Sequence, residues 1–167
     1  MCSATFPDNN LIAFLRRSSP PLRRLDIACN SIDEPHSTIA RLETCITLVP
    51  TVTHLDLLGL TFQAAEHFFT LSSQQPPSDR LLSGVQVLSL HEMSSPFPTD
   101  SSWNMLARGL STRRGTQLRS VSIIMTPIPP ATSLELSPNI LDLFRGLVEG
   151  GMEIYIGTRS RNLLSPS

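Results

Sequence analysis

Cysteine and histidine are the residues of this chain best suited to chemistry, and their spacing supports little of it. The 167-residue sequence contains three cysteines and four histidines. None of them has the spacing of a zinc site or a dithiol motif, and no phosphate-binding glycine loop, zinc-protease helix or serine-nucleophile motif occurs. We therefore expect no catalytic residue, no metal site and no cofactor, and we expect that the protein is not an enzyme.

One pair of side chains still resembles a nucleophile with its base. Cys29 and His54 belong to neighbouring members of a sequence repeat, and a thiol beside an imidazole is a nucleophilic arrangement. Cys29, however, follows a strand at a turn position that repeat proteins commonly fill with a small buried side chain. A small α/β enzyme is therefore the least favoured hypothesis for this chain.

The cysteines also indicate the cellular compartment. Cys2, Cys29 and Cys45 are an odd number without paired spacing, so they form no disulfide framework. The apolar stretches are far shorter than the roughly 18 residues that cross a bilayer, and the chain does not start like a signal peptide. We expect three free thiols and an intracellular location, either cytoplasmic or nuclear.

The charge balance excludes two classes of partner. With 13 basic and 14 acidic side chains, the net charge is -1 and the isoelectric point is about 6.4. Such a chain has no overall field that gathers nucleic acid or anionic lipid, so we expect neither a nucleic acid nor a membrane as partner. All 13 basic residues are arginine, which suits a ubiquitin-ligase adaptor that avoids its own modification. Codon usage is the alternative explanation.

Five similar segments set the positions of the polar side chains. Each segment alternates apolar and polar residues, as a half-buried strand does. Their centres lie 30, 33, 33 and 33 residues apart, which indicates one strand per structural repeat. The inner apolar pairs of the five segments are Leu25/Ile27, Leu55/Leu57, Leu88/Leu90, Val121/Ile123 and Ile154/Ile156.

Apolar residues at helical spacing occupy the stretches between the strands. Ile39, Leu42 and Ile46, for example, recur at intervals of three to four residues. Residues that can cap a helix precede the later stretches. These expected caps are Thr61, Asp100 or Ser101, and Ser137, which is followed by Pro138. Strands and helices that alternate in this way form right-handed parallel units.

The polar residues of the strands define the fold class. They lie on one strand face throughout, so helices can cover only the other face. A doubly wound sheet would carry helices on both faces and strands that are apolar on both sides. We therefore predict an α/β fold: a leucine-rich-repeat-like solenoid of about five parallel strands with all helices on one face. Residues 1–158 form this domain, and residues 159–167 form a flexible tail.

The exposed strand face carries the residues that we expect to contact a partner. In parallel strands of one register Asp26 and Asp56 are neighbours about 4.8 Å apart, and like charges at that spacing are destabilising. Either a basic group of a partner neutralises them, or Arg24 and His54 in the adjacent row do so. Tyr155 supplies an aromatic side chain typical of interfaces. The predicted partner-binding residues are Arg24, Asp26, His54, Asp56, His91, Glu153 and Tyr155.

The repeat resembles a known family. The frame Leu22, Leu25, Ile27 and Asn30 resembles the leucine-rich-repeat pattern L-x-x-L-x-L-x-x-N, and the surrounding sequence is similar to the C-terminal repeats of fungal F-box proteins. The similar phrases are LRRLDI, LVPTVTHLDL, WNMLARGLSTRR before LRSVSI, and GMEIYIGT, and they span about Leu11 to Thr158. The resemblance implies that the chain captures substrates for a cullin-RING ubiquitin ligase.

Two departures from the family pattern qualify this implication. Leu60, Met93 and Thr126 stand where later repeats would have asparagine, so no asparagine ladder runs through the turns. The F-box itself would precede the repeats, and the first expected helix starts within about ten residues of Met1. We therefore expect contact with a ligase scaffold only if an F-box exists in a longer chain.

Three hypotheses for function follow. The leading one is a protein-interaction module that resembles the substrate-recognition repeats of an F-box ubiquitin-ligase adaptor. The second is a structural or residual repeat fragment without a specific ligand. The third is the small α/β enzyme. A protein partner of unknown identity is the only partner that the first hypothesis requires.

Overall fold

A computed structural model shows how the repeat folds. It describes residues 3–5, 9–18, 20–29, 35–74, 82–93, 98–112, 117–126 and 135–165. The strands in these ranges are β1 (Ser3–Thr5), β2 (Arg24–Ala28), β3 (His54–Leu58), β4 (Val87–Met93), β5 (Ser120–Met125), β6 (Glu153–Thr158) and β7 (Arg161–Asn162). The helices are α1 (Asn9–Ser18), α2 (Pro35–Leu48), α3 (Phe62–Gln74), α4 (Asp100–Ser111) and α5 (Pro138–Glu149).

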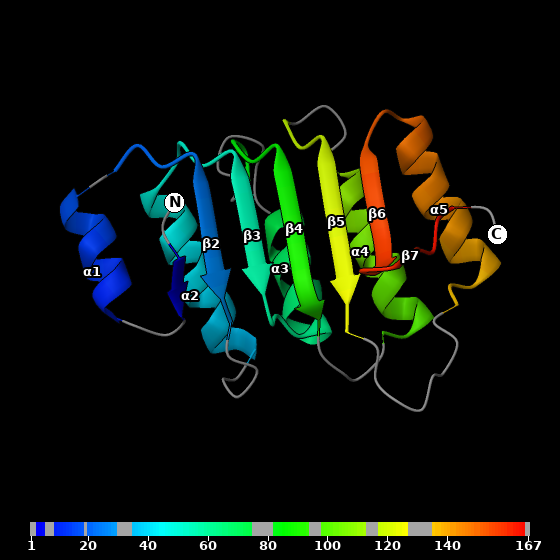
Figure 1. The fold of residues 1–167 in the computed structure, drawn as a ribbon, viewed down its shortest axis with the longest axis horizontal. Coiled ribbons are helices and arrows are strands. Elements are labelled where there is room, and N and C mark those ends of the chain that lie inside the picture. The colour runs from blue at the N-terminus through cyan, green and yellow to red at the C-terminus, as the bar shows by residue number, and fades with distance from the viewer. Residues whose placement is uncertain are drawn as a thin grey trace.

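The strands form one open sheet whose spatial order follows the chain from β1 to β7 (Figure 1). Strands β1 to β6 are parallel, and β7 is antiparallel to β6. Leu25 pairs with Leu55, Leu55 with Leu88, and Leu88 with Val121, which are the pairs that the repeat predicts. The α/β class and the in-register parallel pairing of the five predicted strands are therefore confirmed, whereas β1 and β7 were not predicted.

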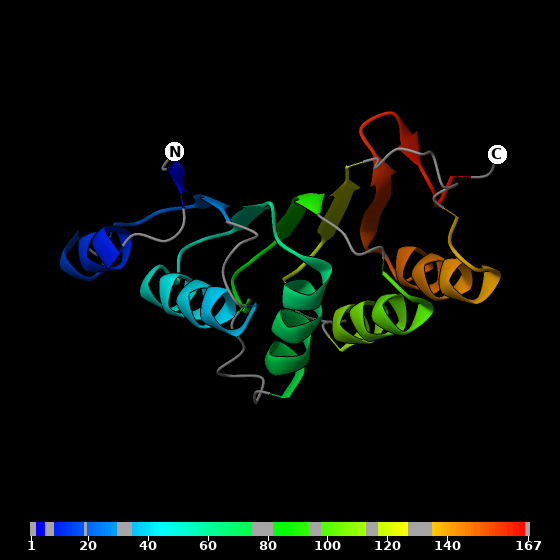
Figure 2. The same cartoon turned by 90° about the horizontal axis from the view of Figure 1, so that it is seen from below.

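The helices lie on one side of the sheet. Figure 2 shows the described helices below the strands and none above them. Because the inward residues of β2 and β3 are almost completely buried and the alternate residues are not, the apolar side of each strand is the side that the helices cover. Among the described residues no helix combines the length and the apolarity needed to cross a bilayer.

Backbone hydrogen bonds repeat where the strands begin. The carbonyl of Arg23 accepts hydrogen bonds from the N–H groups of Thr53 and His54, at 2.8 and 2.9 Å. The carbonyl of Thr53 in turn accepts from Gln86 and Val87, at 2.8 and 3.0 Å. One carbonyl per repeat therefore holds the start of the next strand, which keeps successive strands in one register.

Aromatic contacts join the helical layer. Trp103 in α4 packs edge to face against Phe62 of α3 and Phe144 of α5, with ring centroids 5.1 and 5.8 Å apart. Edge-to-face geometry is a favoured arrangement of aromatic pairs. All three rings are buried, so the only tryptophan of the chain is a core residue that connects three successive helices.

One of the three expected helix caps differs from the prediction, since Ser137 is the N-cap residue of α5 and Pro138 follows it, as expected. Thr61 caps α3 as expected, because its Oγ1 accepts a hydrogen bond from the N–H of Ala64 at 3.1 Å. Helix α4 is capped by Thr99 rather than by Asp100 or Ser101, and the Thr99 hydroxyl accepts from Ser102 N–H at 3.3 Å. Ser137 precedes α5 in an extended conformation without a side-chain cap bond.

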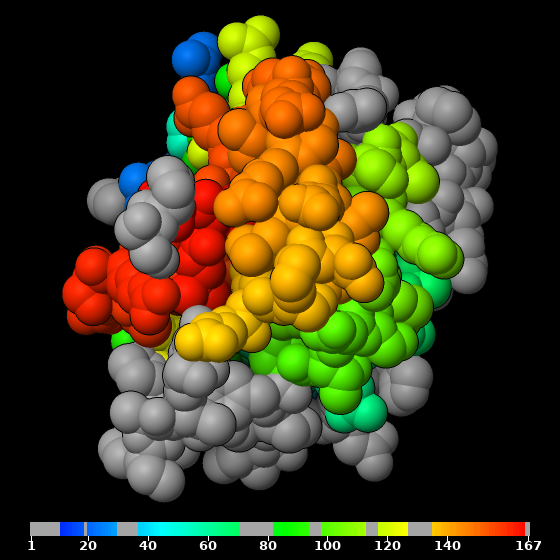
Figure 3. Space-filling view, turned by 90° about the vertical axis from the view of Figure 1, so that its right-hand side faces the viewer, coloured from blue at the N-terminus to red at the C-terminus, as the bar shows by residue number. Residues whose placement is uncertain are grey.

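The C-terminal end is ordered where a flexible tail was expected. Strand β7 pairs with β6, and Leu163 N–H donates to the carbonyl of Ile156 at 2.7 Å. The Asn162 side-chain oxygen accepts hydrogen bonds from Ile156 N–H at 3.4 Å and from Leu164 N–H at 3.1 Å. Figure 3 shows this end of the molecule, with α5 in orange beside the segment in red. The strand was missed because two polar residues have no alternation to detect.

Candidate functional site

The sheet face opposite the helices is called the exposed strand face here, and three rows of side chains cross it. The register places one residue of each strand from β2 to β6 in every row. The first row is Arg24, His54, Val87, Ser120 and Glu153; the second is Asp26, Asp56, Ser89, Ser122 and Tyr155; the third is Ala28, Leu58, His91, Ile124 and Gly157. The first two rows are the ones that the equal repeat steps predict.

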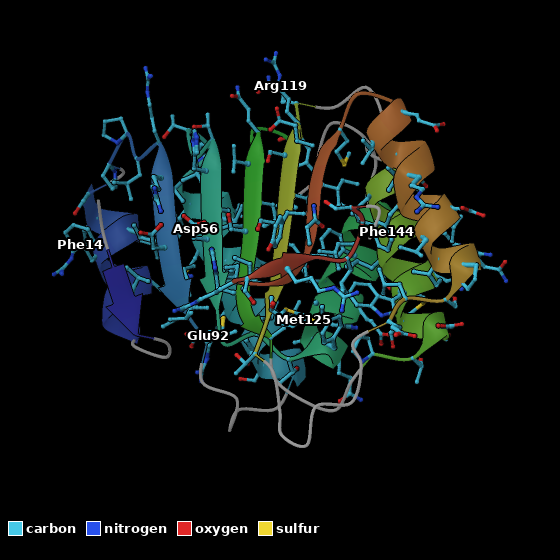
Figure 4. The ribbon with its side chains drawn as sticks, turned by 45° about the vertical axis from the view of Figure 1, so that its right-hand side comes forward. Phe14, Asp56, Glu92, Arg119, Met125 and Phe144 are labelled. Atoms are coloured by element: carbon cyan, nitrogen blue, oxygen red, sulfur yellow. The ribbon has the colours of Figure 1, made fainter. Side chains whose placement is uncertain are left out.

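Arg24 contacts two aspartates on neighbouring strands. Asp26 and Asp56 are register partners, so the predicted stacking of like charges is confirmed. The Arg24 guanidinium lies 3.0 Å from Asp26 Oδ1 through Nε and 2.8 Å from Asp56 Oδ2 through Nη2. The hydrogen bond to Asp26, followed by the charge of Asp56, raises the pKa of Arg24 above its ordinary value. One guanidinium therefore bridges both carboxylates (Figure 4 labels Asp56).

The histidine beside this pair is His91 and not His54. His91 Nε2 lies 3.8 Å from Asp56 Oδ1, whereas His54 Nδ1 hydrogen-bonds the hydroxyl of Thr53 at 2.9 Å. The expectation that His54 helps to neutralise the aspartates is therefore wrong, because the neighbouring hydroxyl holds its ring. Arg24, Asp26, Asp56 and His91 together form what we call the Arg24–Asp56 cluster.

The other two predicted residues lie elsewhere on the face. Glu153 and Tyr155 belong to β6, four strands away from β2 and hence about 19 Å distant. The Tyr155 hydroxyl donates a hydrogen bond to the carbonyl of Thr158, and the ring is half-buried. The Tyr155 hydroxyl is thus already hydrogen-bonded at the end of its own strand. Four of the seven predicted residues therefore form the compact Arg24–Asp56 cluster, and His54 lies next to it on β3. Glu153 and Tyr155 form a separate pair on β6.

The side chains between these two groups are short. Ser89, Ser120 and Ser122 occupy β4 and β5 in the first two rows, next to Val87. Ser89 is buried although it is polar and points away from the apolar core. The charged groups on β2 and β3 consequently stand beside a central strip of small side chains, which leaves their outer sides accessible to a large partner.

The geometry contradicts a Cys29–His54 catalytic pair. His54 starts β3, while Cys29 lies opposite the end of that strand, five residues further along and about 16 Å away. Burial raises the pKa of the Cys29 thiol to about 12, so almost none of it is thiolate at neutral pH. Within the described ranges no three His, Cys, Asp or Glu side chains are grouped as metal ligands would be.

A pocket that the sequence did not reveal lies at the carboxyl ends of β4, β5 and β6. Its volume is about 340 Å³. Figure 4 shows Glu92 and Met125 near the same ends of β4 and β5. The pocket is lined by Glu92, Ile124, Met125, Thr126, Thr158, Arg159 and Ser160. Arg159 belongs to the segment predicted to be a tail. Glu92 is an extra residue inserted into β4 where its register with β5 shifts, and regular alternation along a strand does not predict such an insertion.

Comparison of the chain with family models, with curated proteins and with solved structures found no match. The exposed strand face offers ion pairs, hydrogen bonds and a few apolar contacts. These are the interactions with which protein surfaces recognise one another.

Proposed function

We propose that this chain is a protein-interaction module, a leucine-rich-repeat-like solenoid that binds its partner on the exposed strand face. The Arg24–Asp56 cluster is the centre of the proposed binding surface. The observation that carries the proposal is this charged cluster on a sheet face that none of the described helices covers. The chemistry expected of the partner follows from the charges of the cluster.

The strand arrangement supports the solenoid. Parallel strands in chain order with helices on one side are the arrangement in which each repeat contacts only its neighbours. A buried apolar residue also precedes each of three inner pairs by three positions, as in L-x-x-L-x-L. These residues are Val52, Val85 and Leu118.

Backbone hydrogen bonds link the carboxyl ends of β2, β3 and β4. Cys29 N–H donates to the carbonyl of Leu58 at 2.6 Å, and Gly59 N–H donates to that of His91 at 2.9 Å. Gly59 has a φ of 73°, and a Cβ there would lie 2.7 Å from the Cys29 carbonyl oxygen. Glycine thus permits the close approach of two turns, which supports a degenerate form of the same repeat.

The charges of the cluster favour a basic partner segment. Asp26 and Asp56 carry two negative charges against the one positive charge of Arg24, so these three side chains together have a surplus negative charge. The Asp56 side chain is 18% exposed, which leaves it in reach of a cation. Leu58 is 41% exposed in the next row and offers an apolar contact beside the charges. A segment with lysine or arginine next to an apolar residue is the complementary partner.

The family resemblance supports a role for this binding. In an F-box adaptor the repeats present a substrate to a cullin-RING ligase, and we propose the same role for the exposed strand face. Contact with the ligase scaffold itself would need an F-box in a longer chain. The module as described would supply substrate recognition alone.

A peptide-library selection tests the proposed function. The protein is used to select from a displayed random library, and the enriched peptides are measured against the protein and two variants. We expect Asp56→Arg to weaken binding at least about tenfold, because the added charge repels a basic segment. Asp142→Arg makes the same change on α5, where Asp142 is 75% exposed, and should leave binding unchanged.

The outcome separates the proposal from a fragment without a ligand. Circular dichroism must show that both variants keep the fold. Two results would favour the hypothesis of a structural or residual fragment without a specific ligand. In the first, the selected peptides bind the wild type and a folded Asp56→Arg variant equally. In the second, the wild type enriches no peptide that the variant does not.

A further inference from the structure

The pocket at the carboxyl ends of β4, β5 and β6 combines a buried apolar part with an exposed charge. Met125 is 2% exposed and Ile124 is half-buried, whereas the Arg159 side chain is 80% exposed. The apolar lining therefore lies deeper than the guanidinium. A volume of about 340 Å³ is within the range of pockets that bind small ligands, and it accommodates an aliphatic side chain.

The Arg159 guanidinium above this lining is paired with a carboxylate that another carboxylate can displace. Arg159 Nη2 lies 3.1 Å from Glu92 Oε1, and the Glu92 side chain is 49% exposed. Ion pairs between exposed side chains contribute little to stability because water competes for both charges. A guanidinium also fits a carboxylate through two parallel hydrogen bonds. Another carboxylate can thus replace Glu92 on Arg159 at little cost to the fold.

The backbone of Glu92 is itself unusual. Glu92 has a φ of 53°, the only positive φ of a non-glycine residue among those that the structure describes. It is the residue at which the register between β4 and β5 shifts, between His91 and Met93. Such bulges redirect side chains and are concentrated next to functional sites, where strained backbone is retained. The bulge here brings the Glu92 carboxylate to Arg159 at the pocket.

We propose that this pocket receives an aliphatic side chain of a protein partner, and that a carboxylate next to this side chain replaces Glu92 on Arg159. The carboxylate belongs either to an Asp or Glu of the partner or to its C-terminus. The inference rests on the proposed function in taking a protein as the partner. Ile124 lies in the third row of the exposed strand face, so the pocket is continuous with the proposed binding surface.

Short peptides test the pocket directly. The ε-methyl group of Met125 is observed by NMR in methionine-methyl-labelled protein and assigned with Met125→Leu. We expect acetyl-Leu-Asp-amide to shift this signal in a saturable way, and acetyl-Leu-Asn-amide to bind at least about fivefold more weakly. Acetyl-Ala-Leu as the free acid and as the amide forms a second pair, which shows whether a C-terminal carboxylate serves better than a side-chain one.

Three variants examine the exchange of carboxylates. Arg159→Gln should reduce the affinity for the aspartate peptide at least about fivefold, to that of the asparagine peptide. Glu92→Gln should raise the affinity about two- to fivefold, because the competing carboxylate is removed. Arg145→Gln changes an exposed arginine of α5 that pairs with Asp142 and should leave the affinity unchanged. A gain of affinity in Glu92→Gln is not expected of a residue that only shapes the bulge.

The results also separate the pocket from the exposed strand face. An unmoved Met125 signal with every peptide, equal binding of the aspartate and asparagine peptides, or an unaltered affinity in Arg159→Gln would overturn the pocket proposal. Asp56→Asn should leave these titrations unchanged. If the peptide-library selection fails while the Met125 titration succeeds, the pocket stands and the proposed function of the face fails; the reverse result has the opposite meaning.

Discussion

Arg24 offsets a charge repulsion that the sequence repeat creates. A repeat that places aspartate at the same position of two adjacent strands brings two carboxylates together, which is destabilising. Arg24 contacts both of them and begins the same strand that carries Asp26. The cluster is therefore held together within the chain itself, and the basic partner that we propose would bind side chains that are already in place.

The buried thiols make stability depend on pH. Burial raises the pKa of Cys29 to about 12 and that of Cys45 to about 11, from an ordinary 9.0. Above pH 9 the unfolded chain releases these protons and the folded chain keeps them, so stability is complete below that pH and decreases as the pH rises. Each thiol contributes a decrease that approaches about 1.4 kcal/mol per pH unit.

Removal of one thiol should make this decrease less steep. We expect the free energy of unfolding of Cys45→Ala to fall by about 1 kcal/mol less per pH unit between pH 9.5 and 10.5 than that of the wild type. Urea denaturation at several pH values measures the difference. The same slope in both proteins would show that Cys45 titrates in the folded state as it does in the unfolded chain.

Two glycines should respond in opposite ways to alanine. Gly59 has a positive φ and lies against the Cys29 carbonyl, so Gly59→Ala should cost about 1–3 kcal/mol. Gly146 lies within α5, with nothing within 4 Å of an added Cβ, so Gly146→Ala should stabilise the fold by about 0.5–1 kcal/mol. Thermal or urea denaturation measures both changes, and a harmless Gly59→Ala would contradict the described turn.

At the scale of the elements, β3 provides the sharpest test of register. Leu57 is 0% exposed and its neighbour Leu58 is 41% exposed, because successive side chains of a strand point to opposite faces. We expect Leu57→Ala to cost about 2–5 kcal/mol and Leu58→Ala to change the free energy of unfolding by less than about 0.5 kcal/mol. Similar costs for the two variants, measured by urea denaturation, would refute the register.

The elements differ in how far local sequence specifies them. Strand centres and helical stretches were predictable, since alternation and helical spacing arise from the burial of one face. The cap of α4 was misplaced because Thr99, Asp100 and Ser101 are all acceptable N-cap residues. The bulge at Glu92 was missed because one additional residue near a strand end leaves the inward pair Leu88 and Leu90 unchanged.

At the scale of the whole molecule, the edges of the sheet need protection. A parallel strand at the edge of a sheet leaves backbone groups open to pairing with other chains. Strand β7 covers part of β6, and the Asn162 side chain accepts hydrogen bonds from two backbone N–H groups there. Residues 159–165 are therefore part of the folded unit.

Asn162→Ala tests this closure. The variant removes the acceptor of two backbone N–H groups, so we expect a loss of about 1–3 kcal/mol. Asn139→Ala changes an exposed asparagine of α5 and should remain within about 0.5 kcal/mol of the wild type. Urea denaturation compares the three proteins, and light scattering follows association through an opened β6. An unchanged Asn162→Ala variant would mean that β7 adds nothing to the fold.

The sequence by itself determined the five strands from β2 to β6, their register and the stacking of Asp26 on Asp56. These features follow from a 33-residue period and from alternation, which express local rules that every repeat obeys. Only the tertiary structure decided that His91 rather than His54 approaches Asp56, that Arg159 meets Glu92 across 67 residues, and that a pocket lies beneath them. Those contacts depend on the directions of side chains and on a bulge, where the period no longer constrains the chain.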